Sequence, residues 1–295
     1  MKTAPREFPC PVCGSVRYRI LYPDTLGDRL PRFDYKFGSE HTLTYRVVKC
    51  AECGHGYASP RPENIWAHYR DVEDSVYLAR KDERIATSAR VVRQIRRYMP
   101  SGRLLDVGCA TGEFLDAARE YYEVEGLELS AWSAGICRAR GFPVHTCTLG
   151  DLQTDRRYDA LTLWGVIEHF EFPAREVSEI ARLLKVGGVV ALWTGDVDSW
   201  ISRLLGKRYW YVQGQHIQMF SYRSLCKVFL DRGFKVVAIT RYPYVMSMRS
   251  ISESLARYPM VGWAAKLFLR NAVLSGRLLT LTLPGEMFAI FQKAE

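Results

Sequence analysis

From Arg103 onward the sequence alternates short apolar runs with amphipathic stretches, and this alternation restricts the fold more than any other feature. Strands are predicted at 103–107, 123–129, 158–164, 188–194, 234–240 and 286–292. Helices are predicted at 112–121, 130–141, 174–184 and 221–232, between those strands. Strands that alternate with helices form a parallel sheet covered on both faces, so we expect an α/β fold.

The turn between the first predicted strand and its helix reads Asp106-Val-Gly108-Cys-Ala110-Thr-Gly112. Glycines let the backbone approach a ligand closely, and the N–H groups at a helix start attract negative or electron-rich groups. Glu128 stands sixteen residues after Gly112, at the end of the second strand. A carboxylate in this place can accept both hydroxyls of a ribose. The two features together predict a ligand that contains a ribose.

This turn resembles the first motif of the class I S-adenosylmethionine-dependent methyltransferases, acid-x-Gly-x-Gly-x-Gly, with alanine in place of the middle glycine. The resemblance continues through Gly150-Asp151, Leu163-Trp164-Gly-Val-Ile-Glu168-His169-Phe and Gly187-Gly188, and covers roughly residues 103–292. It implies a Rossmann-like, mostly parallel sheet of seven strands whose last strand is antiparallel. The cofactor residues that it implies are Asp106, Gly108, Ala110, Gly112, Glu128, Leu129, Asp151 and Trp164. A nicotinamide-dependent dehydrogenase is the rival, but its G-x-G-x-x-G spacing is not present.

Four of the eight cysteines form two close pairs, Cys10-Pro-Val-Cys13-Gly and Cys50-Ala-Glu-Cys53-Gly. Such a pair directs two thiolates at one ion, and two pairs complete a tetrahedral site for a structural zinc ion. Redox-active pairs are the alternative. Four sulfur ligands leave no open position, so we expect no catalytic role for this zinc. The 36 residues between the pairs predict an inserted loop or hairpin at about 24–45.

Residues 47–62 resemble the lead-in to methyltransferases of sugar, polysaccharide and antibiotic pathways. The sugar C-methyltransferases carry a four-cysteine zinc module before their catalytic domain. We therefore expect a zinc-ribbon module at 1–62, linking helices at 63–100 and the methyltransferase domain at 101–295. A helical insertion is expected at about 245–282, before the last strand.

A second similar group is the ubiquinone-biosynthesis O-methyltransferases, which share the Glu168-His169 dipeptide. In that group an acid three residues earlier helps to bind a divalent ion. Gly165 occupies this position here, so we expect no catalytic magnesium.

The candidate catalytic residues are His216 as general base, His169 as its partner, and Glu168. Methyl transfer from a sulfonium requires an aligned acceptor and removal of a proton, and histidine titrates near neutral pH. His216 lies in a segment that resembles the His-x₃-Phe-Ser segment of the sugar methyltransferases. The sugar C-methyltransferases have Tyr-x-Glu-His here, whereas this chain has Gln213 and Gln215, which favours O-methylation. The alternative is structural: His169 caps a helix and His216 bonds a loop.

The formal charge of +9, from 41 basic and 32 acidic residues, favours an anionic partner. The expected acceptor is a small molecule or glycan, either nucleotide-linked or lipid-linked, and the sugar C-methyltransferases are one alternative. A second alternative is an RNA-modifying methyltransferase whose zinc module binds RNA. We favour an acceptor other than nucleic acid, because no run of basic residues interleaved with aromatic residues is present.

No apolar run approaches the about 18 residues of a membrane span, and the start MKTAPREFPC lacks the apolar stretch of a signal peptide. We therefore expect a cytoplasmic protein. Residues 259–279 predict a helix with a narrow basic stripe on an apolar body. We favour a helix packed over the acceptor site or at a homodimer contact. The alternative is a helix that lies on the inner membrane face or contacts a lipid-linked glycan.

Overall fold

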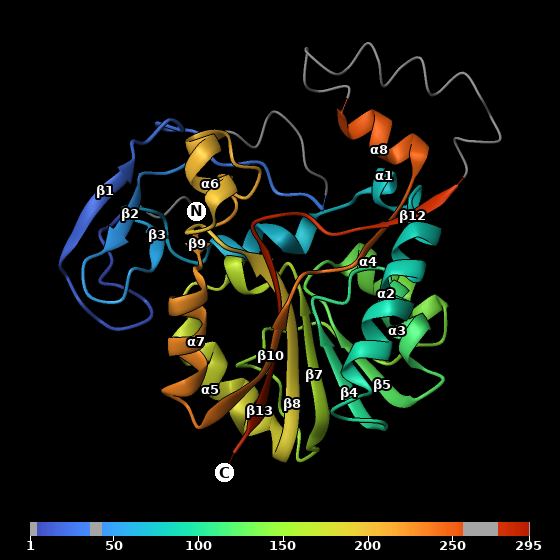
Figure 1. Ribbon diagram of the computed structural model, residues 1–295. Helices are drawn as coiled ribbons and strands as arrows, with labels where there is room; N and C mark the ends of the chain where they lie inside the picture. The colour runs from blue at the N-terminus through green and yellow to red at the C-terminus, as the bar shows by residue number, and fades with distance from the viewer. Residues whose placement is uncertain (1–4, 36–42, 256–276, 295) are drawn as a thin grey trace.

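A seven-stranded sheet forms the centre of the protein in the computed structural model, which describes residues 5–35, 43–255 and 277–294 (Figure 1). Its strands are β4 (Gly102–Val107), β5 (Tyr122–Leu127), β6 (Val144–His145), β7 (Tyr158–Trp164), β8 (Leu184–Gly195), β10 (Phe234–Thr240) and β13 (Glu286–Lys293). Their order in the sheet is β10-β13-β8-β7-β4-β5-β6. The strands β4 to β8 pair in parallel, and β13 is antiparallel to both β8 and β10. The predicted α/β class, the seven strands and the antiparallel last strand are confirmed.

Helices cover both faces of this sheet. Figure 1 shows α5 (Pro173–Leu183) and α7 (Tyr222–Leu230) on one face, and α2 (Lys81–Ile95), α3 (Glu113–Ala118) and α4 (Ala131–Ala139) on the other. Successive side chains of β4 point to opposite faces of the sheet. Leu105 packs in the core under α5 and α7, and Leu104 packs in the core under α2 and α3. Helices α4 and α7 begin after the predicted capping residues, because the side chains of Ser130 and Ser221 accept N-cap hydrogen bonds there.

The N-terminal residues form a second, four-stranded antiparallel sheet of β1 (Tyr18–Tyr22), β2 (Val47–Cys50), β3 (Gly56–Ala58) and β9 (Gln218–Met219). Its fourth strand, β9, comes from the segment between β8 and α7, far along the chain. Val48 and Tyr57 of this sheet pack in the same core as Phe220 and Leu225. The two sheets are therefore joined by shared apolar packing as well as by the chain itself.

Short helices follow strands β3, β7 and β8 in the chain. They are η2 (Ile65–Asp71), α1 (Ser75–Leu78), η3 (Ile167–His169), α6 (Trp200–Leu205) and η4 (Gly206–Arg208). None of the helices in the described ranges combines the length and the apolar character of a membrane span.

The expected helical insertion differs from the structure at its ends. Residues Tyr244–Ser247 form strand β11, Met248–Leu255 form helix α8, and Leu278–Leu281 form strand β12, which pairs antiparallel with β11. The hydrophobic pattern of the sequence did not predict strands at the two ends, because each strand has only four residues and forms by pairing with the other. The predicted amphipathic helix at 259–279 lies outside the described residues except at its end, where residues 278 and 279 belong to β12.

Candidate functional site

The turn between β4 and α3 is shaped by three residues with a positive φ. The angle is 73° at Gly108, 46° at Ala110 and 85° at Gly112. An added Cβ would lie 2.6 Å from Val166 Cγ2 at the first glycine and 2.7 Å from Cys137 Sγ at the last. Both positions therefore require glycine for conformation and for space. Ala110 adopts a left-handed backbone without the freedom of glycine, so the rest of the turn must hold it there.

Glu128 directly follows β5, and its carboxylate is bound to this turn. Its Oε2 accepts a hydrogen bond from the Ala110 amide at 2.8 Å, and Oε1 accepts one from the Ser130 amide at 2.8 Å. Oε1 also accepts a hydrogen bond from the hydroxyl of Tyr35 at 3.2 Å. Burial raises the pKa of Glu128, and these hydrogen bonds oppose the shift. The structure thus brings the predicted acid and the predicted turn together.

Asp106 and Trp164 lie at the carboxyl ends of the neighbouring strands β4 and β7. Asp106 is buried and accepts a hydrogen bond from the hydroxyl of Thr162 at 2.6 Å, and burial raises its pKa to about 8. The ring of Trp164 packs against Phe114, with centroids 4.8 Å apart. Its buried Nε1 has no hydrogen-bond partner among the described residues. A buried donor in this state leaves a hydrogen bond for a ligand to complete.

Leu129 and Asp151, the other two predicted cofactor residues, lie in loops at the same sheet edge. Leu129 is half-buried next to Glu128. Asp151 is exposed in the loop after β6, and its carboxylate accepts a hydrogen bond from the hydroxyl of Thr148 at 2.6 Å. This bond stabilises a turn, which is a common role of a Gly-Asp pair. A cofactor role for either residue stays a prediction.

The three candidate catalytic residues converge beyond the end of β7. Glu168 and His169 belong to η3, whereas His216 lies in the loop before β9. One nitrogen or oxygen atom from each lies within 4.8 Å of the other two. The rings of His169 and His216 meet nearly edge to face, with centroids 4.8 Å apart and an interplanar angle of 69°. The structure thus brings the three residues together, and their catalytic roles stay a prediction.

Backbone carbonyls fix the orientation of both imidazoles. His216 Nδ1 lies 2.8 Å from the carbonyl oxygen of Tyr211, and His169 Nδ1 lies 2.9 Å from that of Gln215. A carbonyl oxygen only accepts, so each Nδ1 carries the proton. The lone pair of a neutral His216 is therefore on Nε2, the nitrogen that could take a proton from an acceptor.

Burial controls the charge in this cluster. Burial raises the pKa of Glu168 to about 7. Hydrogen bonds donated by the hydroxyls of Tyr211 and of Thr194, the latter at 3.2 Å, oppose this rise. Burial lowers the pKa of His169 to about 4. At neutral pH His169 is therefore uncharged, and Glu168 holds its proton more tightly than an exposed glutamate does.

The sulfur atoms of Cys10, Cys13, Cys50 and Cys53 converge, and all four lie within 4.8 Å of one another. Two of the separations are 3.5 Å, between Cys10 and Cys53, and 3.6 Å, between Cys13 and Cys50. Each pair is followed by a glycine whose amide donates to the carbonyl oxygen of the first cysteine, at 2.8 and 3.1 Å. Tetrahedral zinc with bonds of about 2.3 Å places its sulfurs about 3.8 Å apart, so the donor set and spacing fit this ion.

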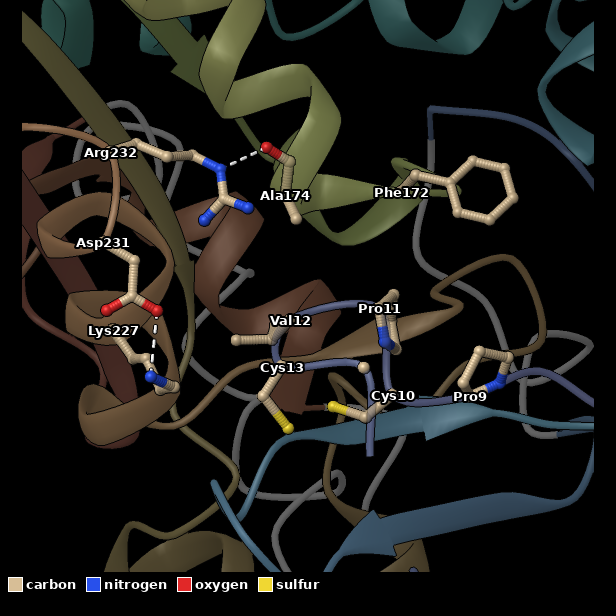
Figure 2. A pocket seen from close by; sticks show the side chains of 11 residues that line it. Pro9, Cys10, Pro11, Val12, Cys13, Phe172, Ala174, Lys227, Asp231 and Arg232 are labelled. Carbon is tan, nitrogen blue, oxygen red and sulfur yellow. Dashed lines mark hydrogen bonds and ion pairs between the residues drawn. The ribbon is translucent and has the colours of Figure 1, made fainter. Parts of the chain in front are cut away.

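The first cysteine pair borders a surface cleft of about 520 Å³ between the N-terminal segment and the helices α5 and α7 (Figure 2). On the helix side, Lys227 donates to Asp231 at 2.9 Å, and Arg232 donates to the carbonyl oxygen of Ala174. None of the predicted cofactor or catalytic residues lines this cleft. It is separate from the site at the carboxyl edge of the sheet.

Comparison with known proteins places this chain in a family. Residues 78–239, more than half of the chain, match the family described as Methyltransferase domain. The chain is 31% identical over 118 residues to a ubiquinone biosynthesis O-methyltransferase of Alkalilimnicola ehrlichii, covering 36% of this chain and 48% of the relative. It is 29% identical over 130 residues to the probable tRNA methyltransferase 9B of Bos taurus, and this match covers 43% of this chain and 28% of the relative. The chain thus spans less than half the length of each of these two relatives.

A solved structure has the same fold at low sequence identity. It is the complex between the Haloferax volcanii Trm112 methyltransferase activator and the putative methyltransferase, with a TM-score of 0.54 and 17% identity over 78% of this chain and 96% of that chain. The family match over residues 78–239 shows that the chain belongs to the Methyltransferase domain family. It is an S-adenosylmethionine-dependent methyltransferase, as its fold and motifs predicted.

Sequence reasoning missed three tyrosines that contact the site. Tyr35 donates to Glu128, Tyr211 donates to Glu168, and the hydroxyl of Tyr69 lies 3.0 Å from His169 Nδ1. In the sequence, these three pairs are separated by 93, 43 and 100 positions, respectively. No local pattern marks a tyrosine whose partner is that distant in the chain.

Proposed function

We propose that this methyltransferase transfers the methyl group of S-adenosylmethionine to a hydroxyl of a sugar, a glycan or another small-molecule acceptor in the cytoplasm. The observation that carries the proposal is the orientation of His216, whose Nδ1 bonds to the Tyr211 carbonyl and whose Nε2 is the basic nitrogen. A hydroxyl acceptor needs such a base, because the oxygen must lose its proton as it takes the methyl group.

The residues at the sheet edge fit the cofactor. Glu128 would accept the ribose hydroxyls, and the turn at Gly108 and Gly112 would pass close to the ligand because neither residue has a side chain. The Nε1 of Trp164, which has no hydrogen-bond partner in the described part of the chain, would donate to an oxygen or nitrogen of the ligand. Bound there, the cofactor supplies an electrophilic methyl group on a positively charged sulfur.

His216 would remove the proton of the acceptor hydroxyl, and the ring of His169 would hold the imidazole of His216 by edge-to-face contact. The hydroxyl of Tyr211 donates to Glu168, and the carbonyl oxygen of the same tyrosine bonds to His216. Glu168 would therefore hold in place the residue that orients the base. Gln213 and Gln215 contribute amide groups, which are not bases. This composition supports O-methylation over C-methylation.

We also propose a structural zinc ion held by Cys10, Cys13, Cys50 and Cys53. The support is the convergence of four sulfurs at tetrahedral spacing. Its function would be to fix the two cysteine turns against the core that the N-terminal sheet shares with α7.

RNA methylation is the second candidate, favoured by the formal charge of +9 and by the tRNA methyltransferase among the relatives. The ubiquinone O-methyltransferase relative points instead to a small molecule. A salt titration separates these two candidates, because binding to phosphates weakens steeply as salt rises.

The test combines cofactor binding with a methyl-transfer assay on a panel of acceptors. Calorimetry with S-adenosylhomocysteine should show binding to the wild type and a loss of at least about tenfold in Glu128→Ala. Radiolabelled S-adenosylmethionine should then label nucleotide sugars, lipid-linked glycans or phenolic acceptors, but not bulk RNA. Labelling of RNA with salt-sensitive binding would replace the proposal by the second candidate. Unchanged cofactor affinity in Glu128→Ala would reject the cofactor site.

A further inference from the structure

Tyr35 connects the N-terminal segment to the acid of the cofactor site. Its hydroxyl donates to Glu128 Oε1 at 3.2 Å and accepts from the hydroxyl of Ser133 at 3.3 Å. Its ring packs on that of Tyr77, with centroids 5.2 Å apart and an interplanar angle of 48°. Burial and the negative charge of Glu128 raise the pKa of Tyr35, so the phenol keeps its proton at neutral pH.

The carboxylate of Glu128 cannot keep this hydrogen bond and also bind a ribose through both hydroxyls. A carboxylate has about four lone-pair positions. Three of them are taken by the amides of Ala110 and Ser130 and by the hydroxyl of Tyr35. Two ribose hydroxyls would bring the number of donors to five, so one of the three must leave.

The donor that can leave is the side chain. The Ala110 amide belongs to the glycine turn, and the Ser130 amide belongs to the N-cap residue of α4, so both are fixed by backbone structure. Tyr35 belongs to a segment without helix or strand, at residues 23–35, and it can turn away by rotation about its side-chain bonds.

We propose that Tyr35 is a residue of the cofactor site, which bonds Glu128 in the free enzyme and yields this bond to a ribose hydroxyl when the cofactor binds. The proposal rests on the proposed function of Glu128 as the ribose acceptor. Breaking the hydrogen bond costs free energy, so the hydroxyl of Tyr35 weakens cofactor binding and favours release of the product S-adenosylhomocysteine.

The residues next to Tyr35 extend this exchange to the catalytic cluster. The Asp34 amide donates to the side-chain oxygen of Gln215 at 3.4 Å, and the ring of Phe33 meets that of Tyr69 edge to face at 5.3 Å. Tyr69 and the carbonyl of Gln215 both contact His169 Nδ1. One short segment therefore touches the cofactor acid and the supports of His169, and a movement of Tyr35 would reach both.

The test measures S-adenosylhomocysteine affinity by calorimetry on the full chain. Tyr35→Phe keeps the ring and removes the hydroxyl, and we expect the Kd to fall by about threefold to tenfold because ligand binding no longer breaks a hydrogen bond to a charged group. Tyr22→Phe is the matched control, since it removes a hydroxyl from β1 of the N-terminal sheet, which lies on the opposite side of the molecule from β5 (Figure 1). Its Kd should stay at the wild-type value. If thermal melting shows that Tyr35→Phe is unfolded, Tyr35→Leu is measured in its place.

The outcomes separate the two proposals. If Glu128→Ala loses affinity while Tyr35→Phe keeps the wild-type Kd, the exchange is wrong and the cofactor site stands. A weaker Kd in Tyr35→Phe would also overturn the exchange, because it would make the hydroxyl a direct ligand contact. If Glu128→Ala keeps the wild-type Kd, the cofactor site itself is wrong.

Discussion

Tyr211 contacts two candidate catalytic residues at once: its carbonyl oxygen lies 2.8 Å from His216 Nδ1, and its hydroxyl donates to Glu168. The backbone contact selects the tautomer of His216, and the side-chain contact holds the carboxyl group in the same buried cluster. Because Tyr211 is itself buried, neither contact is open to competition from water. The orientation of His216 is therefore set before any acceptor arrives.

Replacement of this imidazole tests its role as the base. His216→Ala should lower turnover by about a hundredfold, because removal of the acceptor proton then depends on water. Affinity for S-adenosylhomocysteine should stay close to that of the wild type, since the proposed cofactor contacts, made by Glu128, the glycine turn and Trp164, do not include His216. Steady-state kinetics on the identified acceptor and calorimetry measure the two effects.

A second histidine provides the control for that experiment. His145 ends β6 and pairs with Glu125 at 3.0 Å, away from the cluster, so His145→Ala should turn over at nearly the wild-type rate. If His216→Ala keeps turnover within a few fold of this control, then His216 is not the base.

The glycine turn provides a test that does not need an acceptor. Gly108→Ala should destabilise the protein by about 2–4 kcal/mol, because the new Cβ would meet both a positive φ and Val166. Gly141→Ala is the matched control: its φ is 84°, but nothing lies within 4 Å of an added Cβ, so only about 1–2 kcal/mol of backbone strain is expected. Urea unfolding measures both values, and equal losses would contradict a steric role for Val166.

Local patterns in the sequence predicted the elements that local physics determines. Strands β7 and β10 lie at their predicted bounds because each is an apolar run with clear turn signals on both sides. The caps at Ser130 and Ser221 are confirmed because a serine side chain bonds an amide only three residues away. The convergence of the glycine turn and Glu128 followed from parallel strands that end at one edge.

The parts that the sequence did not reveal depend on distant pairing. Strand β9 has only two residues, and it exists because Gln218 pairs with Tyr57 of β3. The contact of Tyr35 with Glu128 likewise joins two parts of the chain that share no local pattern. Sequence reasoning could predict that Glu128 lies beside the glycine turn, but it could not show which distant side chain donates a hydrogen bond to this carboxylate.

Removal of the proposed zinc ion should unfold the N-terminal sheet first. Cys53→Ser should abolish zinc binding, from about one ion per chain, and lower the melting temperature, because the four sulfurs link two separate turns. Cys147→Ser is the control, since Cys147 is a half-buried cysteine outside the cluster and should leave the metal content unchanged. Elemental analysis with thermal melting measures both, and a wild-type protein without tightly bound zinc would contradict the proposal.

The raised pKa of Glu168 predicts how stability depends on pH. Burial raises this pKa to about 7 from an ordinary value of 4.5, so the folded chain holds the proton more tightly than the unfolded chain. Its contribution to stability is full below pH 4.5 and is lost as pH rises from 4.5 through 7. Glu168→Gln stays neutral at every pH, so between pH 5 and 8 the wild type should lose about 2–3 kcal/mol relative to this variant. Urea unfolding across that range measures the difference, with Glu120→Gln at an exposed position as the control, and a difference that stays constant with pH would contradict the buried, protonated carboxyl group.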